Sequence, residues 1–165
     1  HPVNRRQRQM CIRDRAKGTL DFVGLNYYTH VLVGPASVSL LKMKFPKRRQ
    51  EVATEFGYPM YAEGLRRAIE FLAPLNVPIE ITENGVADAE DTLRTEHLRR
   101  HLWVLSNAVK DGHDVRSYHH WSLMDNFEWA EGYSMRFGLH RVDFESQERT
   151  LRPSGEVYKA IVGRR

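Results

Sequence analysis

Polar and aromatic residues follow three apolar segments of this 165-residue chain at the point where each segment ends. They stand at residues 26–30, 82–85 and 121–129. In α/β architectures the residues that do chemistry lie just beyond the carboxyl ends of the strands, so we expect the three groups to meet. Glu83 follows an apolar strand and precedes a glycine, where a carboxylate can attack an anomeric carbon and later be displaced by water.

The neighbours of Glu83 favour this chemistry over a structural role. Tyr28 could donate a hydrogen bond to the carboxylate, and Trp121 could form an apolar platform for one face of a sugar ring. Glu128 and Trp129 could bind the hydroxyl groups of that ring. Each residue also has a structural alternative: Glu83 could cap a helix or face solvent, and Tyr28 and Trp121 could pack in the core. Glu128 could be a solvated charge, and Trp129 could anchor a loop.

The elements that must position these residues alternate between strand and helix. The apolar patterns predict three strands at 20–28, 79–82 and 115–123, and helices at 61–75, 95–111 and 154–162. Residues 34–60 and the stretch before the last helix are expected to be long loops. Such alternation predicts an α/β protein with a parallel sheet. Three strands leave two open edges, so the pattern resembles three successive units of a larger fold.

The second predicted helix contains two histidines four residues apart, His97 and His101. They could face one metal ion, but the His-Glu-x-x-His pattern is absent and no third ligand is evident. We therefore expect both histidines on the helix surface and no metal site. The buried face of this helix is expected to carry Leu98, Leu102, Leu105 and Val109. No phosphate loop or nucleotide fingerprint occurs, so no cofactor is expected.

Charge and composition argue against a nucleic-acid or membrane partner. Residues 1–15 hold five arginines and one acid, which accounts for the whole net charge of +4. A basic surface confined to one tail is not a binding face, although a phosphate-binding arm stays possible as an alternative. This tail is expected to be disordered or extraneous, and the domain to cover residues 16–165. No apolar run is long enough for a membrane span, and a single cysteine fits a reducing, cytoplasmic location.

Four segments of the chain together resemble glycoside hydrolase family 1. They are DFVGLNYYTH (21–30), ITENGVAD (81–88), HWSLMDNFEWAEGYSMRFGLHRVDF (120–144) and RPSGEVYKAI (152–161). The resemblance extends over residues 16–165. It implies a (β/α)8 TIM barrel, of which this chain would supply the C-terminal part, strands six to eight with their helices.

The resemblance also implies a role for each candidate residue. Glu83 would be the nucleophile, and Tyr28 would donate a hydrogen bond to it. The residues that would bind the sugar or close the pocket around it are Asn26, Trp121, Glu128, Trp129 and Phe137. Because the Glu128 carboxylate would repel a phosphate, the implied substrate is an unphosphorylated β-glycoside, either a small molecule or an oligosaccharide.

One departure from the family pattern limits what this chain is expected to do alone. The acid/base glutamate of the family lies in an Asn-Glu-Pro motif, which is absent here. Retaining hydrolysis needs two carboxyl groups about 5–5.5 Å apart. Glu80 is expected to face the helices, so it cannot replace the missing group. We expect a β-glucosidase-like hydrolase by family, with little or no activity in the isolated chain. The alternative is a non-catalytic carbohydrate-binding or non-functional partial barrel, and the oligomeric state is not indicated.

Overall fold

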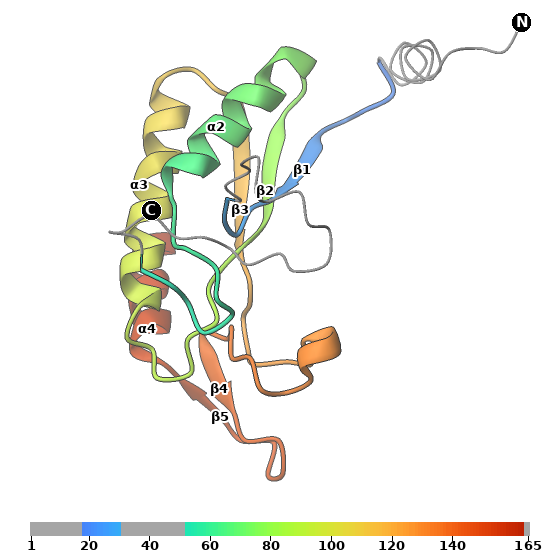
Figure 1. Ribbon diagram of the computed structural model, residues 1–165. Helices are drawn as coiled ribbons and strands as arrows, with labels where there is room; N and C mark the ends of the chain where they lie inside the picture. Colours follow the sequence, from blue (N-terminus) through green and yellow to red (C-terminus); the bar gives the residue numbers. More distant parts are fainter. Residues whose placement is uncertain (1–17, 31–51, 164–165) are drawn as a thin grey trace, which may run out of the picture.

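A three-stranded parallel sheet forms the centre of the protein (Figure 1). The computed structural model describes residues 18–30 and 52–163, so the predicted tail 1–15 and most of the predicted loop 34–60 lie outside the described residues. The strands are β1 (Val23–Asn26), β2 (Ile79–Asn84) and β3 (Val115–His120), in the order β1-β2-β3. The parallel sheet that the alternating pattern predicts is therefore confirmed.

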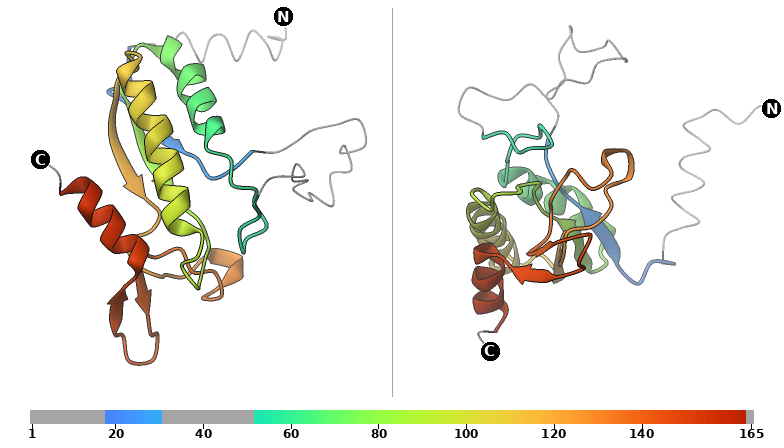
Figure 2. Two further views of the ribbon diagram at one scale, coloured as in Figure 1. Left: turned by 90° about the vertical axis from the view of Figure 1, so that its left-hand side faces the viewer. Right: turned by 90° about the horizontal axis from the view of Figure 1, so that it is seen from below.

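Two helices, α2 (Glu63–Leu72) and α3 (Arg94–Lys110), cover one face of this sheet (Figure 2). The core between the layers is apolar and contains Leu65, Ile69, Ile79, Ile81, Val104 and Ala108. The last helix, α4 (Pro153–Val162), packs beside α3. On the other face of the sheet, Gly24, Arg116 and His119 are exposed. None of the helices in the described segments is long and apolar enough to cross a membrane.

Several element boundaries differ from the predictions. The first strand begins at Val23 rather than residue 20, and both Leu20 and Phe22 are 46% exposed. The third strand ends at His120, because the chain then turns into the loop that carries the candidate site. The first predicted helix is α2 followed by a 3₁₀ turn, Ala73–Leu75. That turn has a proline in its first positions, which cannot continue an α-helix.

The sequence predicted a loop before the last helix, but this stretch also contains regular structure. It contains an antiparallel hairpin of β4 (His140–Val142) and β5 (Arg149–Leu151). Both strands have only three residues, and the hairpin projects away from the parallel sheet (Figure 1). Strands this short carry too little alternation of apolar and polar residues to be detected from the sequence.

The predicted orientation of Glu80 is wrong. Its neighbours Ile79 and Ile81 are buried against α2 and α3, so alternation along the strand places Glu80 on the face away from the helices. Strict alternation would then turn Glu83 toward the helices. The register of β2 against β3 shifts between Ile81 and Asn84, and this irregularity brings Glu83 onto the same face as Glu80.

The histidines of α3 are also placed differently from the prediction. His97 and His101 are buried, 1% and 0% exposed, and their rings stack 3.9 Å apart. Leu98 is buried as predicted, but Val109 is 47% exposed. The buried face of α3 therefore differs from the predicted leucine stripe: it includes His97, His101 and Val104. Together with the half-buried His120 of β3, whose ring nitrogens are buried, the two histidines of α3 form a histidine cluster.

Acid is expected to unfold the protein through this histidine cluster. Burial lowers the pKa of His101 to about 4 and of His120 to about 3, against about 6.5 in an unfolded chain. The unfolded state therefore binds more protons below pH ~6.5, so stability is full above that pH and falls as pH drops toward 4. Each cluster histidine contributes a loss of about 1.4 kcal/mol per pH unit in this window.

Urea unfolding at pH 7 and at pH 4.5 measures this loss. His101→Gln should make the free energies of unfolding at the two pH values more alike. His119 is exposed and precedes His120 in β3, so His119→Gln is the control and should leave the difference unchanged. The same pH dependence in both variants would show that other groups control acid unfolding.

Candidate active site

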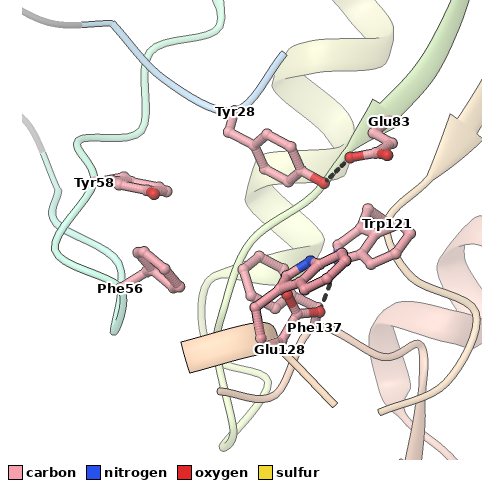
Figure 3. Close-up of a pocket in the computed structure, with 8 residues that line it drawn as sticks. Tyr28, Phe56, Tyr58, Glu83, Trp121, Glu128 and Phe137 are labelled. Atoms are coloured by element: carbon pink, nitrogen blue, oxygen red, sulfur yellow. Dashed lines mark hydrogen bonds between the residues drawn. The ribbon is translucent and has the colours of Figure 1, made fainter. Parts of the chain in front are cut away.

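One pocket opens at the carboxyl ends of the three parallel strands (Figure 3). Its volume is about 290 Å³. Aromatic rings and two carboxylates line it: Tyr28, Phe56, Tyr58, Glu83, Trp121, Glu128, Trp129 and Phe137. Six of the seven residues that the sequence singled out are thus brought together from three separate segments of the chain.

Tyr28 and Glu83 form a hydrogen-bonded pair on one wall of the pocket (Figure 3). The Tyr28 hydroxyl donates to Oε2 of Glu83 at 2.6 Å. The chain positions both residues through a backbone bond of 2.9 Å, from the amide of Tyr27 to the carbonyl of Glu83. Burial, followed by the bond to Glu83, raises the pKa of Tyr28, so the phenol stays neutral and keeps donating to the carboxylate.

Trp121 and Glu128 form a second pair on the opposite wall of the pocket (Figure 3). The indole Nε1 of Trp121 donates to Oε1 of Glu128 at 2.9 Å. The Trp121–Ser122 peptide bond is cis. A β-carbon on Gly85 would lie 1.7 Å from the carbonyl oxygen of Trp121, so only glycine lets the end of β2 pass this close. The bond from Trp121 orients the carboxylate of Glu128, which can still accept further hydrogen bonds from a ligand.

Phe137 closes the pocket from a buried position, whereas two other candidates lie at its margin. The Phe137 ring is 4% exposed and meets the Tyr28 ring edge-on, with centroids 6.2 Å apart. Trp129 lines the pocket but is 83% exposed. Asn26 is not among the lining residues. Its Oδ1 accepts a 2.6 Å hydrogen bond from the hydroxyl of Thr82, the residue before Glu83 in β2.

The sequence interpretation missed two lining residues, Phe56 and Tyr58, which it placed in a long loop. They lie in a tight turn, in which the amide of Thr54 donates to the carbonyl of Tyr58 at 2.9 Å. Glu55 fixes this turn to the segment after β2, because its carboxylate accepts the amide of Ala89 at 2.9 Å. The only signal in the sequence was two aromatic residues flanking a glycine, which is too common to indicate a site.

A buried ion pair fixes the loop that carries Glu128 and Phe137. Asp125 accepts two bonds from the Arg152 guanidinium, at 2.9 and 3.1 Å, just before α4 begins. The same carboxylate accepts the backbone amides of Gly138 at 2.9 Å and Val142 at 3.3 Å. Asp125 therefore ties both ends of the loop to the rest of the fold.

The described part of the chain contains no group of three or more His, Cys, Asp or Glu side chains arranged to hold a metal ion. What the pocket offers instead is a carboxylate oriented by a neutral phenol, a second carboxylate oriented by an indole, and aromatic surface between them. A pyranose ring presents hydroxyl groups at its edge and apolar C–H groups on its faces, which matches this combination. The geometry thus defines a candidate carbohydrate site of the kind found in glycosidases.

The chain belongs to glycosyl hydrolase family 1, whose family model matches residues 6–165. It is 38% identical to the β-galactosidase of Saccharolobus solfataricus over 94% of this chain and 34% of that protein. It is 39% identical to the β-glucosidase of an Agrobacterium strain, over 86% of this chain and 34% of that protein. The chain therefore spans about a third of the length of these relatives.

Solved structures give the same result. The β-glucosidase of Pyrococcus furiosus superposes with a TM-score of 0.81 and 39% identity, over 98% of this chain and 38% of that chain. A β-glucosidase of Thermotoga maritima superposes with a TM-score of 0.77 and 37% identity, over 87% of this chain and 35% of that chain. The relatives are TIM barrels, and this chain corresponds to part of one.

Proposed function

We propose that this chain supplies strands six to eight and the nucleophile of a retaining β-glycosidase. The complete enzyme would hydrolyse terminal β-linked sugars through a glycosyl-enzyme intermediate on Glu83. The observation that carries this proposal is the 2.6 Å bond between Tyr28 and Glu83, inside the pocket that also holds Trp121 and Glu128.

Each step of the proposed reaction uses a group with a suitable position. The Glu83 carboxylate, oriented by its hydrogen bond from Tyr28, attacks the anomeric carbon as the glycosidic C–O bond breaks, and the aglycone oxygen leaves with a proton from the acid. Trp121 supports an apolar face of the sugar, and Glu128 and Trp129 bind its outer hydroxyl groups. Water then attacks the same carbon, gives its proton to the former acid, now a base, and releases the Glu83 carboxylate. A sugar acceptor in place of water would give transglycosylation.

The second carboxyl group of the reaction is proposed to come from outside this sequence. Protonation of the leaving group requires an acid about 5–5.5 Å from the nucleophile. The sequence contains no Asn-Glu-Pro, and Glu80 stands three residues before Glu83 along an extended strand. A strand rises about 3.3 Å per residue, so the Cα atoms of the two glutamates are about 10 Å apart. Glu80 is not among the residues that line the pocket with Glu83, so we do not assign it as the acid.

The substrate is proposed to be an unphosphorylated β-glucoside, β-galactoside or β-fucoside. Relatives are named β-galactosidase, β-glucosidase and bifunctional β-D-glucosidase/β-D-fucosidase, which supports this range. The carboxylate of Glu128 faces the pocket and would repel a phosphate group. We also propose a cytoplasmic location, because the single cysteine of the sequence suits a reducing compartment.

The isolated chain should show little or no turnover, and any turnover should depend on the leaving group. Dinitrophenolate departs without protonation, whereas an alkoxide does not. Alkyl β-glucosides should therefore react at least about 100-fold more slowly than in a reconstituted barrel, in which this chain replaces the matching segment of the P. furiosus β-glucosidase. Steady-state rates with both substrates measure this. Equal alkyl glucoside rates in the chain and the barrel would show that the chain contains its own acid.

A second candidate function is a non-catalytic carbohydrate-binding or non-functional partial barrel. The exposed face of the sheet and the 83% exposed Trp129 favour it for the isolated chain. Titration of the chain with glucose or cellobiose, followed by tryptophan fluorescence, separates the two functions. Binding without turnover in both the chain and the reconstituted barrel would support the binding module.

A further inference from the structure

Asn84, the last residue of β2, bonds to both neighbouring segments of the sheet. Its side chain is fully buried, with an exposed fraction of 0%. The amide Nδ2 donates to the carbonyl of Tyr27 at 2.7 Å, and Oδ1 accepts the Tyr118 hydroxyl at 2.9 Å. Its backbone carbonyl accepts the amide of Trp121, also at 2.9 Å. One residue thus joins the ends of all three strands.

Two of these three bonds end at or beside a residue of the candidate site. Tyr27 precedes Tyr28, Asn84 follows Glu83, and Trp121 is itself a wall of the pocket. We propose that Asn84 is a positioning residue, which holds Tyr28 and Glu83 at hydrogen-bonding distance by fixing the strand ends against one another. This inference rests on the proposed role of Glu83.

The irregular sheet explains why a side chain is needed at this point. The register of β1 against β2 shifts between Leu25 and Asn26, and that of β2 against β3 shifts between Ile81 and Asn84. These shifts interrupt the regular backbone ladder just where Glu83 must face the pocket. The Asn84 side chain provides connections across the interruption. Aspartate would lack the donor to Tyr27, and leucine would fill the space but make neither of the two side-chain hydrogen bonds.

The position of the Tyr28 hydroxyl can be measured without any enzymatic activity. We would label the full chain with 3-fluorotyrosine, record ¹⁹F NMR spectra, and assign the Tyr28 resonance with the Tyr28→Phe variant. Glu83→Ala gives the reference position for a Tyr28 hydroxyl that has lost its acceptor at residue 83. The Tyr28 resonance should move toward that position in Asn84→Leu. Tyr118→Phe removes the hydroxyl that bonds to Asn84 but keeps the ring. In this variant the Tyr28 resonance should move in the same direction, but less far.

A matched asparagine provides the control. Asn126 is partly buried and donates to the Ser122 hydroxyl at 3.0 Å, in the loop after β3. Asn126→Leu should leave the Tyr28 resonance in place. An unmoved Tyr28 resonance in Asn84→Leu, together with a lower melting temperature, would overturn the proposal and leave Asn84 a purely stabilising residue. If Asn84→Leu does not fold, Tyr118→Phe decides in the same way.

Kinetics then separate this inference from the proposed function. In the reconstituted barrel, Asn84→Leu should lower kcat roughly 10- to 100-fold and leave KM within about threefold, because misplacement of a reacting group costs rate more than binding. If the reconstituted barrel with Asn84 in place is inactive, but Asn84→Leu shifts the Tyr28 resonance, the proposed glycosidase function is refuted and the positioning role is retained. An active barrel in which kcat is unchanged by Asn84→Leu would refute the positioning role alone.

Discussion

Replacement of Glu83 by glutamine is expected to lower the kcat of the reconstituted barrel at least about 1000-fold. Glutamine keeps the shape of the side chain and can still contact the Tyr28 hydroxyl, but its amide cannot form a glycosyl ester. Loss of the nucleophile removes the covalent route altogether, so binding should survive while turnover does not. Release of nitrophenol from an aryl β-glucoside measures the rate, and a melting curve checks that the variant is folded.

Glu80 provides the matched control for this substitution. It lies on the same strand and the same face as Glu83, three residues earlier. Glu80→Gln removes the same charge and should leave kcat within about threefold, because Glu80 is not among the residues that line the pocket. A large loss in Glu80→Gln, or a small loss in Glu83→Gln, would show that the nucleophile is misassigned.

Replacement of Asp125 by asparagine is expected to have the largest effect on stability. The Asp125 side chain is 0% exposed and its partner Arg152 only 7% exposed. Removing the negative charge takes away the carboxylate that neutralises the buried guanidinium and leaves it neutral acceptors such as the Gly138 carbonyl. Such a loss costs about 3–5 kcal/mol in comparable pairs. The two backbone amides that Asp125 accepts, from Gly138 and Val142, would also lose a charged acceptor. Urea unfolding followed by circular dichroism gives the free energy of unfolding.

An exposed pair on α3 provides the comparison. Nε of Arg100 lies 2.7 Å from Oε1 of Glu96, and the two side chains are 56% and 49% exposed. Glu96→Gln should change the free energy of unfolding by less than about 0.5 kcal/mol, because solvent screens the pair. Equal losses in Asp125→Asn and Glu96→Gln would contradict the role assigned to the buried pair.

The sequence predicts the candidate site well where neighbouring residues carry the information. Tyr28, Glu83 and Trp121 each lie at or near the carboxyl end of a strand, so their meeting at one edge of a parallel sheet follows from local patterns alone. Phe56 and Tyr58 could not be found this way. Their turn reaches the pocket through Glu55, which bonds to Ala89, and this tertiary contact leaves no periodic signal in the sequence.

The fold departs from the sequence predictions where a local irregularity controls side-chain direction. Regular alternation predicted opposite faces for Glu80 and Glu83, but the register shift after Ile81 places both on one face. The leucine stripe of α3 predicted that His97 lies on the surface. The histidine is buried because a neutral imidazole packs against its stacked neighbour His101, a choice that hydrophobicity alone does not reveal.

Covalent trapping of the reconstituted barrel tests the central claim most directly. A 2-deoxy-2-fluoro-β-glucoside with a dinitrophenolate leaving group should form a glycosyl-enzyme that turns over slowly, because the fluorine destabilises the transition states of both steps. Peptide mass spectrometry should then find the fluoroglucosyl group on the peptide that contains Glu83, and on no other residue. Rapid turnover with no labelled peptide, or a label on a different carboxylate, would contradict the assignment of Glu83 as the nucleophile.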